Sequence, residues 1–131
     1  MMLKKRLQST PRLSLSCLMA LLLSTPLAWS QLPDNAVWID VRTPSEFAQG
    51  HVEEATLIPW DGIETGIRAL KLDKDAPIVL YCGSGGRAER AREALQANGY
   101  SQVTNAGGLE EAQALKAALK AALKATSQAE D

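Results

Sequence analysis

The segment from residue 78 to residue 99 constrains the fold of this chain more strongly than any other. Its first four residues, Ile78 to Tyr81, are apolar throughout, which predicts a strand buried on both faces of a parallel sheet. Three glycines fall within residues 83–86. Residues 87–98 then show the periodicity of an amphipathic helix, which Gly99 ends. A buried strand that runs through a tight loop into a helix is typical of α/β folds.

The rest of the chain continues this alternation of short strands and helices. We expect further strands at residues 36–41, 55–59 and 102–105, and further helices at residues 44–50, 60–70 and 110–131. Thr43, Pro44 and Glu46 form a capping-box pattern before the first helix. The alternation predicts an α/β fold whose small, mostly parallel sheet is flanked by helices on both faces. Ligands bind such sheets at the carboxyl ends of the strands, where Cys82 stands.

The first thirty residues have the pattern of a secretory signal peptide. A basic region precedes the apolar run Cys17–Leu23, and Ala28-Trp29-Ser30 supplies small residues before a cleavage site. The basic residues are Lys4, Lys5, Arg6 and Arg12. The apolar run is shorter than the roughly 20 residues that span a bilayer, which favours cleavage over an uncleaved membrane anchor. We therefore expect residues 1–30 to be removed and residues 31–131 to form one exported domain.

Removal of this leader leaves an acidic domain. The chain has 14 basic and 15 acidic residues, and subtracting the four basic residues of the leader leaves 10 against 15, a net charge of −5. No basic stripe remains, which argues against nucleic acid and anionic membranes as partners. Residues 31–131 contain one histidine, His51, and one cysteine, so no metal-site spacing is present. We expect neither a metal nor a cofactor.

Residues 110–131 are rich in Ala, Lys and Leu and have high helical propensity. Leu115, Leu119 and Leu123 recur every four residues and form one narrow apolar stripe. We expect this stripe to dock the helix on the domain, with a partner-binding helix as the alternative. The tail is expected to fray from Thr126 onward.

Cys82 is the only thiol of residues 31–131, and its neighbours favour a reactive thiol over a buried small hydrophobe. The loop that follows it consists of Gly83, Ser84, Gly85, Gly86 and Arg87. Its glycines let the backbone curl and point N–H groups inward, and the next helix presents its positive end to the same point. These groups, with the charge of Arg87, favour a thiolate and would bind a persulfide or an oxyanion.

The length of this loop separates two kinds of cysteine chemistry. Four residues separate Cys82 from Arg87, whereas phosphatase-type loops have five and enclose a phosphate. The tighter ring is better matched to a single sulfur atom. Tyr81 also stands where phosphatases usually place a histidine. The alternatives are an oxyanion enzyme, such as a phosphatase or arsenate reductase, and a non-catalytic binding module.

Short motifs are spread over most of residues 31–131. They are Trp38-Ile39-Asp40-Val41-Arg42, Glu46-Phe47, Gly50-His51-Val52, Ala55, Ile58-Pro59, Val79-Leu80-Tyr81-Cys82, Gly85, Gly99-Tyr100 and Asn105-Ala106-Gly107-Gly108-Leu109. Together these motifs resemble the rhodanese homology domain, most closely the single-domain periplasmic rhodaneses of the phage-shock-protein E type.

The resemblance implies a periplasmic thiosulfate sulfurtransferase with Cys82 as its nucleophile. In such an enzyme the thiolate takes sulfane sulfur from a small anionic donor, thiosulfate or a persulfide, and passes it to cyanide, a thiol or a protein acceptor. Residues 83–87 would bind the transferred sulfur. Asp40 and Arg42 map onto a pair that supports the catalytic loop, with a purely structural ion pair as the alternative.

Some residues depart from the family pattern or carry no chemistry. Many rhodaneses have a basic residue where this loop has Gly83 or Gly86, so a persulfide donor stays open beside thiosulfate. We expect His51 to make a structural hydrogen bond and the tryptophans, Trp38 and Trp60, to serve packing. Gly107-Gly108 either approaches the loop or only turns into the last helix.

Overall fold

The computed structural model describes residues 32–129, which form nine elements of secondary structure. In chain order they are β1 (Val37–Asp40), α1 (Pro44–Gln49), β2 (Thr56–Leu57), a 3₁₀ turn (Trp60–Gly62), α2 (Ile63–Ala69), β3 (Ile78–Tyr81), α3 (Gly86–Ala97), β4 (Val103–Asn105) and α4 (Leu109–Gln128). Each predicted strand and helix is present, with ends that differ by at most three residues from those expected. The predicted leader, residues 1–30, lies outside the described residues and stays a prediction.

The four strands form one sheet in the order β2-β1-β3-β4, and every pair is parallel. Val37 is in register with Ile78, and Ile78 with Val103. All four residues of β3 are buried, as the unbroken apolar run predicted. The carboxyl end of β3 therefore opens in the middle of the sheet, between two neighbouring strands.

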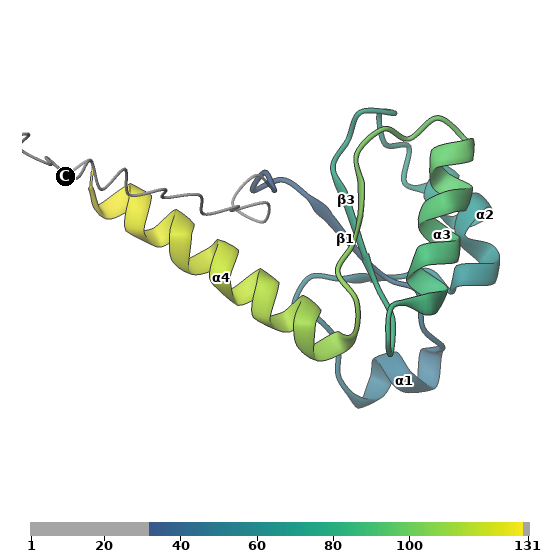
Figure 1. The fold of residues 1–131 in the computed structure, drawn as a ribbon, viewed down its shortest axis with the longest axis horizontal. Coiled ribbons are helices and arrows are strands. Elements are labelled where there is room, and N and C mark those ends of the chain that lie inside the picture. Colours follow the sequence, from purple (N-terminus) through teal and green to yellow (C-terminus); the bar gives the residue numbers. More distant parts are fainter. Residues whose placement is uncertain (1–31, 130–131) are drawn as a thin grey trace, which may run out of the picture.

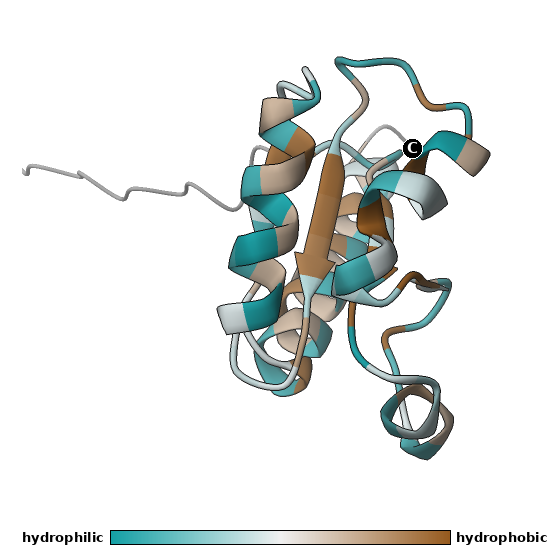
Figure 2. Cartoon of the chain, turned by 90° about the vertical axis from the view of Figure 1, so that its right-hand side faces the viewer, coloured by the Kyte–Doolittle hydropathy of each residue, from teal (hydrophilic) through white to brown (hydrophobic). Residues whose placement is uncertain are grey.

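Helices cover both faces of the sheet, which confirms the predicted α/β architecture (Figure 1). Ile39, Ile78 and Leu80 face the side on which α2 and α3 pack. Trp38 and Val79 point the opposite way, into the side that α4 covers. Alternate side chains of a strand face opposite sides, so these short strands are apolar on both faces. Figure 2 shows the sheet as strongly hydrophobic, between helices with mixed faces.

The first helix, α1, forms the predicted capping box at one end of the sheet (Figure 1). The N–H of Thr43 donates to Glu46 Oε2 at 2.9 Å, and the N–H of Glu46 donates to Thr43 Oγ1 at 3.3 Å. Pro44 occupies the first turn, where its missing N–H costs no hydrogen bond. The helix ends at Gly50, whose φ of 150° suits a glycine.

The last helix, α4, docks through only part of its predicted stripe. Leu115 and Leu119 pack against the core, whereas Leu123 is 41% exposed, because α4 extends beyond the sheet (Figure 1). The helix continues to Gln128, and Thr126 Oγ1 donates to the carbonyl of Ala122, while the expected fraying of the tail stays a prediction. Within residues 32–129 no helix has both the length and the apolar content that a membrane span requires.

Candidate active site

Cys82 lies at the carboxyl end of β3, where the active-site loop (residues 82–87) leaves the sheet. Its N–H donates to the carbonyl of Gly107 at 3.0 Å, which fixes the first residue of the loop beside the segment that follows β4. Only 1% of the residue is exposed. The thiol is therefore held within the loop rather than displayed on the surface, and a narrow group reaches it most easily.

Backbone N–H groups surround the sulfur. The N–H of Gly85 donates to Cys82 Sγ at 2.9 Å, and Gly85 takes a φ of 96°, which a side chain would disfavour. Burial raises the pKa of the Cys82 thiol, but the N–H groups of Ala88, Ser84, Gly85 and Arg87 outweigh it and bring the pKa below its ordinary value. The structure thus contains the predicted amide ring and extends it to Ala88, in the first turn of α3.

Gly83 brings the loop into contact with the turn before α4, whereas a Cβ atom on Gly86 would meet no atom within 4 Å. A Cβ atom on Gly108 would lie 2.7 Å from the carbonyl oxygen of Gly83, so the loop packs directly on the turn before α4. Gly86 is the first residue of α3. The close contact shows that Gly107-Gly108 approaches the loop as well as leading into the last helix.

Asn105 is a supporting residue to which the sequence reasoning gave no role. Its Nδ2 donates to the carbonyl of Gly85 at 3.0 Å, and its Oδ1 accepts from the N–H of Gly107 at 2.9 Å. One side chain thus connects the residue that bonds to sulfur with the turn that holds Cys82. Its position as the last residue of β4, shortly before Gly107-Gly108, was the available signal, since polar residues at carboxyl ends of parallel strands face ligand sites.

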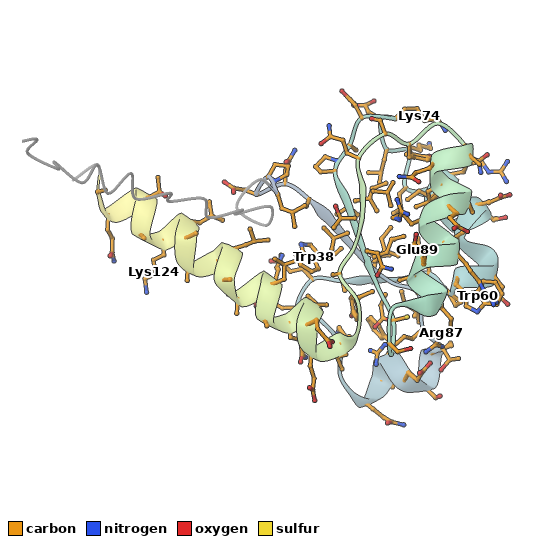
Figure 3. The ribbon with its side chains drawn as sticks, viewed as in Figure 1. Trp38, Trp60, Lys74, Arg87, Glu89 and Lys124 are labelled. Atoms are coloured by element: carbon orange, nitrogen blue, oxygen red, sulfur yellow. The ribbon has the colours of Figure 1, made fainter. Side chains whose placement is uncertain are left out.

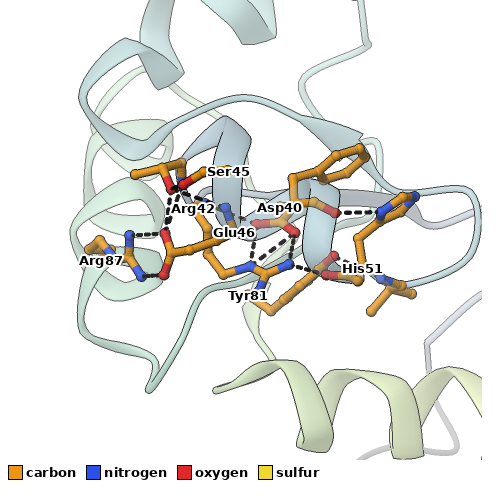
Figure 4. Close-up of polar contacts among 11 residues, drawn as sticks. Asp40, Arg42, Ser45, Glu46, His51, Tyr81 and Arg87 are labelled. Atoms are coloured by element: carbon orange, nitrogen blue, oxygen red, sulfur yellow. Dashed lines mark hydrogen bonds and ion pairs between the residues drawn. The ribbon is translucent and has the colours of Figure 1, made fainter.

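Arg87 extends from the loop to α1 and does not stand free. Its Nη1 and Nη2 each donate to the carboxylate of Glu46 at 2.9 Å, a bidentate pair (Figure 4; Arg87 is also labelled in Figure 3). Arg87, together with the N–H of Thr43, holds the pKa of Glu46 well below its usual range. The predicted loop cation is present, but a carboxylate balances its charge.

Asp40 and Arg42 form a buried pair whose hydrogen bonds do not extend to residues 83–87. Arg42 Nε donates to Asp40 Oδ1 at 2.9 Å and its Nη2 to Asp40 Oδ2 at 2.6 Å and to the carbonyl of Gly50 at 2.7 Å (Figure 4). The guanidinium also lies 5.6 Å from the ring centre of Tyr81, which precedes Cys82. These contacts favour the structural alternative, with contact to the loop only through Tyr81.

The remaining residues considered from sequence have structural roles. His51 Nδ1 lies 2.9 Å from the carbonyl oxygen of Phe47, and the two rings stack, so the expected structural hydrogen bond is confirmed. Trp38 is buried under α4, and Trp60 packs at the surface near Arg90 (Figure 3). In the part of the chain that the structure describes, no three His, Cys, Asp or Glu side chains are arranged to hold a metal ion.

Comparison with known proteins identifies the class to which this fold and site belong. The sequence profile of the rhodanese-like domain matches residues 25–115, and the chain belongs to this family.

The relatives cover much of this domain at moderate identity. Thiosulfate sulfurtransferase PspE of Escherichia coli K12 is 39% identical over 74 residues, which are 56% of this chain and 71% of the relative. A sulfurtransferase of Allochromatium vinosum is 38% identical over 72 residues, 55% of this chain and 65% of the relative. The solved structure of a rhodanese with anions from E. coli matches with a TM-score of 0.56 at 38% identity, over 58% of this chain and 89% of that one.

Proposed function

We propose that this protein transfers sulfane sulfur through a persulfide on Cys82. The observation that carries the proposal is the 2.9 Å hydrogen bond from the N–H of Gly85 to Cys82 Sγ, within a ring of four amide groups that lower the pKa of the thiol. A structural cysteine needs no such ring, because a neutral thiol buried among apolar groups is already stable. A nucleophilic cysteine needs it, because the thiolate is the attacking species.

The reaction has two balanced steps. In the first, the Cys82 thiolate attacks the terminal sulfur of the donor, a new S–S bond forms, and the bond between that sulfur and the donor breaks. The electron pair leaves with the donor residue, which is sulfite when the donor is thiosulfate. In the second, cyanide or a thiolate attacks the outer sulfur of the persulfide, and the electron pair of the broken bond returns to Cys82 Sγ.

The low exposure of Cys82 supports a donor that presents one terminal sulfur atom, as thiosulfate and persulfides do. The relatives named as sulfurtransferases support the same chemistry. The leader pattern of residues 1–30 supports a periplasmic location, where the acceptor would be a small thiol, cyanide or an exported protein.

Mass spectrometry of residues 31–131 after incubation with thiosulfate or an organic persulfide tests the proposal. We expect a mass increase of one sulfur atom, located at Cys82, and its loss on adding cyanide with release of thiocyanate. The Cys82→Ser variant is expected to gain nothing. Absence of an adduct with every sulfane donor, in folded protein, would reject the proposal and leave a binding module on a rhodanese scaffold.

A further inference from the structure

Both guanidinium groups closest to the active-site loop are already paired with carboxylates. Arg87 is the only basic residue of the loop, and Glu46 holds it with two hydrogen bonds of 2.9 Å. Arg42, behind Tyr81, is held in the same way by buried Asp40. Each pair is formally neutral, so Glu46 offsets the attraction that Arg87, which also interacts with Cys82, exerts on an approaching anion. The largest contributions that lower the pKa of Cys82 come from backbone amide groups.

Glu46 is held in place by contacts on two sides. Its Oε2 accepts from the N–H and Oγ1 of Thr43, both at 2.9 Å, and from Arg87 Nη1 at 2.9 Å, while Oε1 accepts from Arg87 Nη2 (Figure 4). The side chains of Arg87 and Glu46 are 31% and 36% exposed, and such pairs contribute little to stability. The main effect of Glu46 on the site is therefore to balance the charge of Arg87, whose Nη2 would lie 3.3 Å from a Cβ atom on Gly83 of the loop.

We propose that Glu46 is a specificity-determining residue that makes the site select sulfur donors with one negative charge or none over doubly charged ones. This inference rests on the proposed function and concerns its donor class. A thiolate repels a dianion such as thiosulfate twice as strongly as a monoanion, and the carboxylate of Glu46 reduces the attraction by which Arg87 would offset that repulsion. An organic thiosulfonate meets the requirement: the thiolate bonds to its terminal sulfur, the sulfur–sulfur bond breaks, and the electron pair leaves on a sulfinate.

Glu46→Gln tests the inference because glutamine still serves at this position of a capping box but carries no charge. We compare kcat/KM for thiosulfate with kcat/KM for methanethiosulfonate, a singly charged donor of the same sulfur. The ratio is expected to rise on the order of tenfold in Glu46→Gln, because the two donors differ by one unit charge, and one charge acting over roughly 12 Å at an effective dielectric constant of about 20 changes a rate about tenfold. The matched control is Glu54→Gln, which removes one charge from an exposed pair with Lys116 on α4 and should leave the ratio unchanged.

A second measurement reports the electrostatic potential at Cys82 Sγ and does not require catalytic turnover. We divide the rate of Cys82 alkylation by anionic iodoacetate by the rate of alkylation by neutral iodoacetamide. Both rates are proportional to the thiolate fraction, so this fraction cancels in the quotient. This quotient should rise in Glu46→Gln and fall in Arg87→Gln, which leaves the carboxylate unpaired. A loosened loop would instead move both variants in one direction.

The outcomes separate the two proposals. Transfer from methanethiosulfonate with unchanged ratios in Glu46→Gln would overturn the role of Glu46 and leave the sulfurtransferase intact. Absence of transfer from either donor in every variant, the parent chain included, would reject the function and the donor preference with it. The alkylation quotients would then show only whether Glu46 sets the charge at Cys82.

Discussion

Replacing Asn105 with alanine should raise the pKa of the Cys82 thiol, although the Asn105 side chain makes no hydrogen bond to the sulfur. The Nδ2 of Asn105 donates to the carbonyl of Gly85 at 3.0 Å. Gly85 has a φ of 96°, and because glycine has no Cβ atom it can leave this conformation easily unless a contact restrains it. The N–H of the same residue donates to Cys82 Sγ at 2.9 Å. We expect the Gly85 N–H to leave the sulfur when the Asn105 side chain is removed.

The magnitude follows from the hydrogen bond that is lost. A hydrogen bond to a charged group contributes about 1.5–3 kcal/mol, and 1.4 kcal/mol is a factor of ten in an equilibrium constant. Three other amides still lower the pKa of Cys82, so only one of four contributions disappears. The thiolate fraction at a fixed pH below the pKa should therefore fall on the order of tenfold in Asn105→Ala.

The assay is the pH dependence of Cys82 alkylation by iodoacetamide, whose midpoint should move to higher pH. Asn105 Nδ2 also donates to Glu89 Oε2 at 3.1 Å. Asn98→Ala is therefore the matched control, because Asn98 Nδ2 likewise donates to a backbone carbonyl and a glutamate, but at the far end of α3. Asn105→Asp keeps the acceptor for Gly107 and loses the donor to Gly85, so it should behave like the alanine variant. An unmoved midpoint in Asn105→Ala, in folded protein, would refute the argument that Asn105 positions Gly85.

Three further changes have expected outcomes. Gly108→Ala places a Cβ atom 2.7 Å from a backbone oxygen of the active-site loop and should cost about 1–3 kcal/mol in urea unfolding, whereas Gly62→Ala, which meets open space, should cost far less. Asp40→Ala leaves Arg42 buried without its carboxylate and should lower the free energy of unfolding by about 3–5 kcal/mol. The hydrogen bond with Arg92 lowers the pKa of Glu89 to about 2. The stabilisation from the charged carboxylate is therefore present above the ordinary pKa near 4.5 and is lost as the pH falls toward 2. Between pH 5 and pH 2 the urea midpoint should decline less in Glu89→Gln than in the parent chain.

The parts of the site that sequence predicted are those built from neighbouring residues. The buried strand, the glycine loop and the start of α3 follow one another along the chain, so their order alone places amide groups around Cys82. The capping box of α1 is equally local, since Thr43 and Glu46 are three residues apart. Such features depend on backbone propensity and spacing, which a single sequence displays.

The parts that sequence did not predict join distant segments. The contact between Glu46 and Arg87 spans 41 positions, and that between Asn105 and Gly85 spans 20. Neither follows from a local pattern, because both depend on the order of strands in the sheet and on the rotamers of long side chains. The sequence accordingly predicts the position of Arg87 but not its carboxylate partner, Glu46.

The use of amide dipoles in place of free cations fits both halves of the proposed reaction. The resting thiolate and the persulfide each carry one negative charge, so the ring around Cys82 stabilises both without rearrangement. A free cation beside the sulfur would attract a dianionic donor, but it would also retain the sulfite that leaves. Because Arg87 is bound to Glu46, its attraction for the leaving sulfite is reduced, and the site exchanges long-range attraction of the donor for easier release of the product. The rate of sulfur transfer from a neutral donor should therefore depend weakly on ionic strength. The rate of transfer from thiosulfate should rise with salt concentration, because salt screens the repulsion between the thiolate and the dianion.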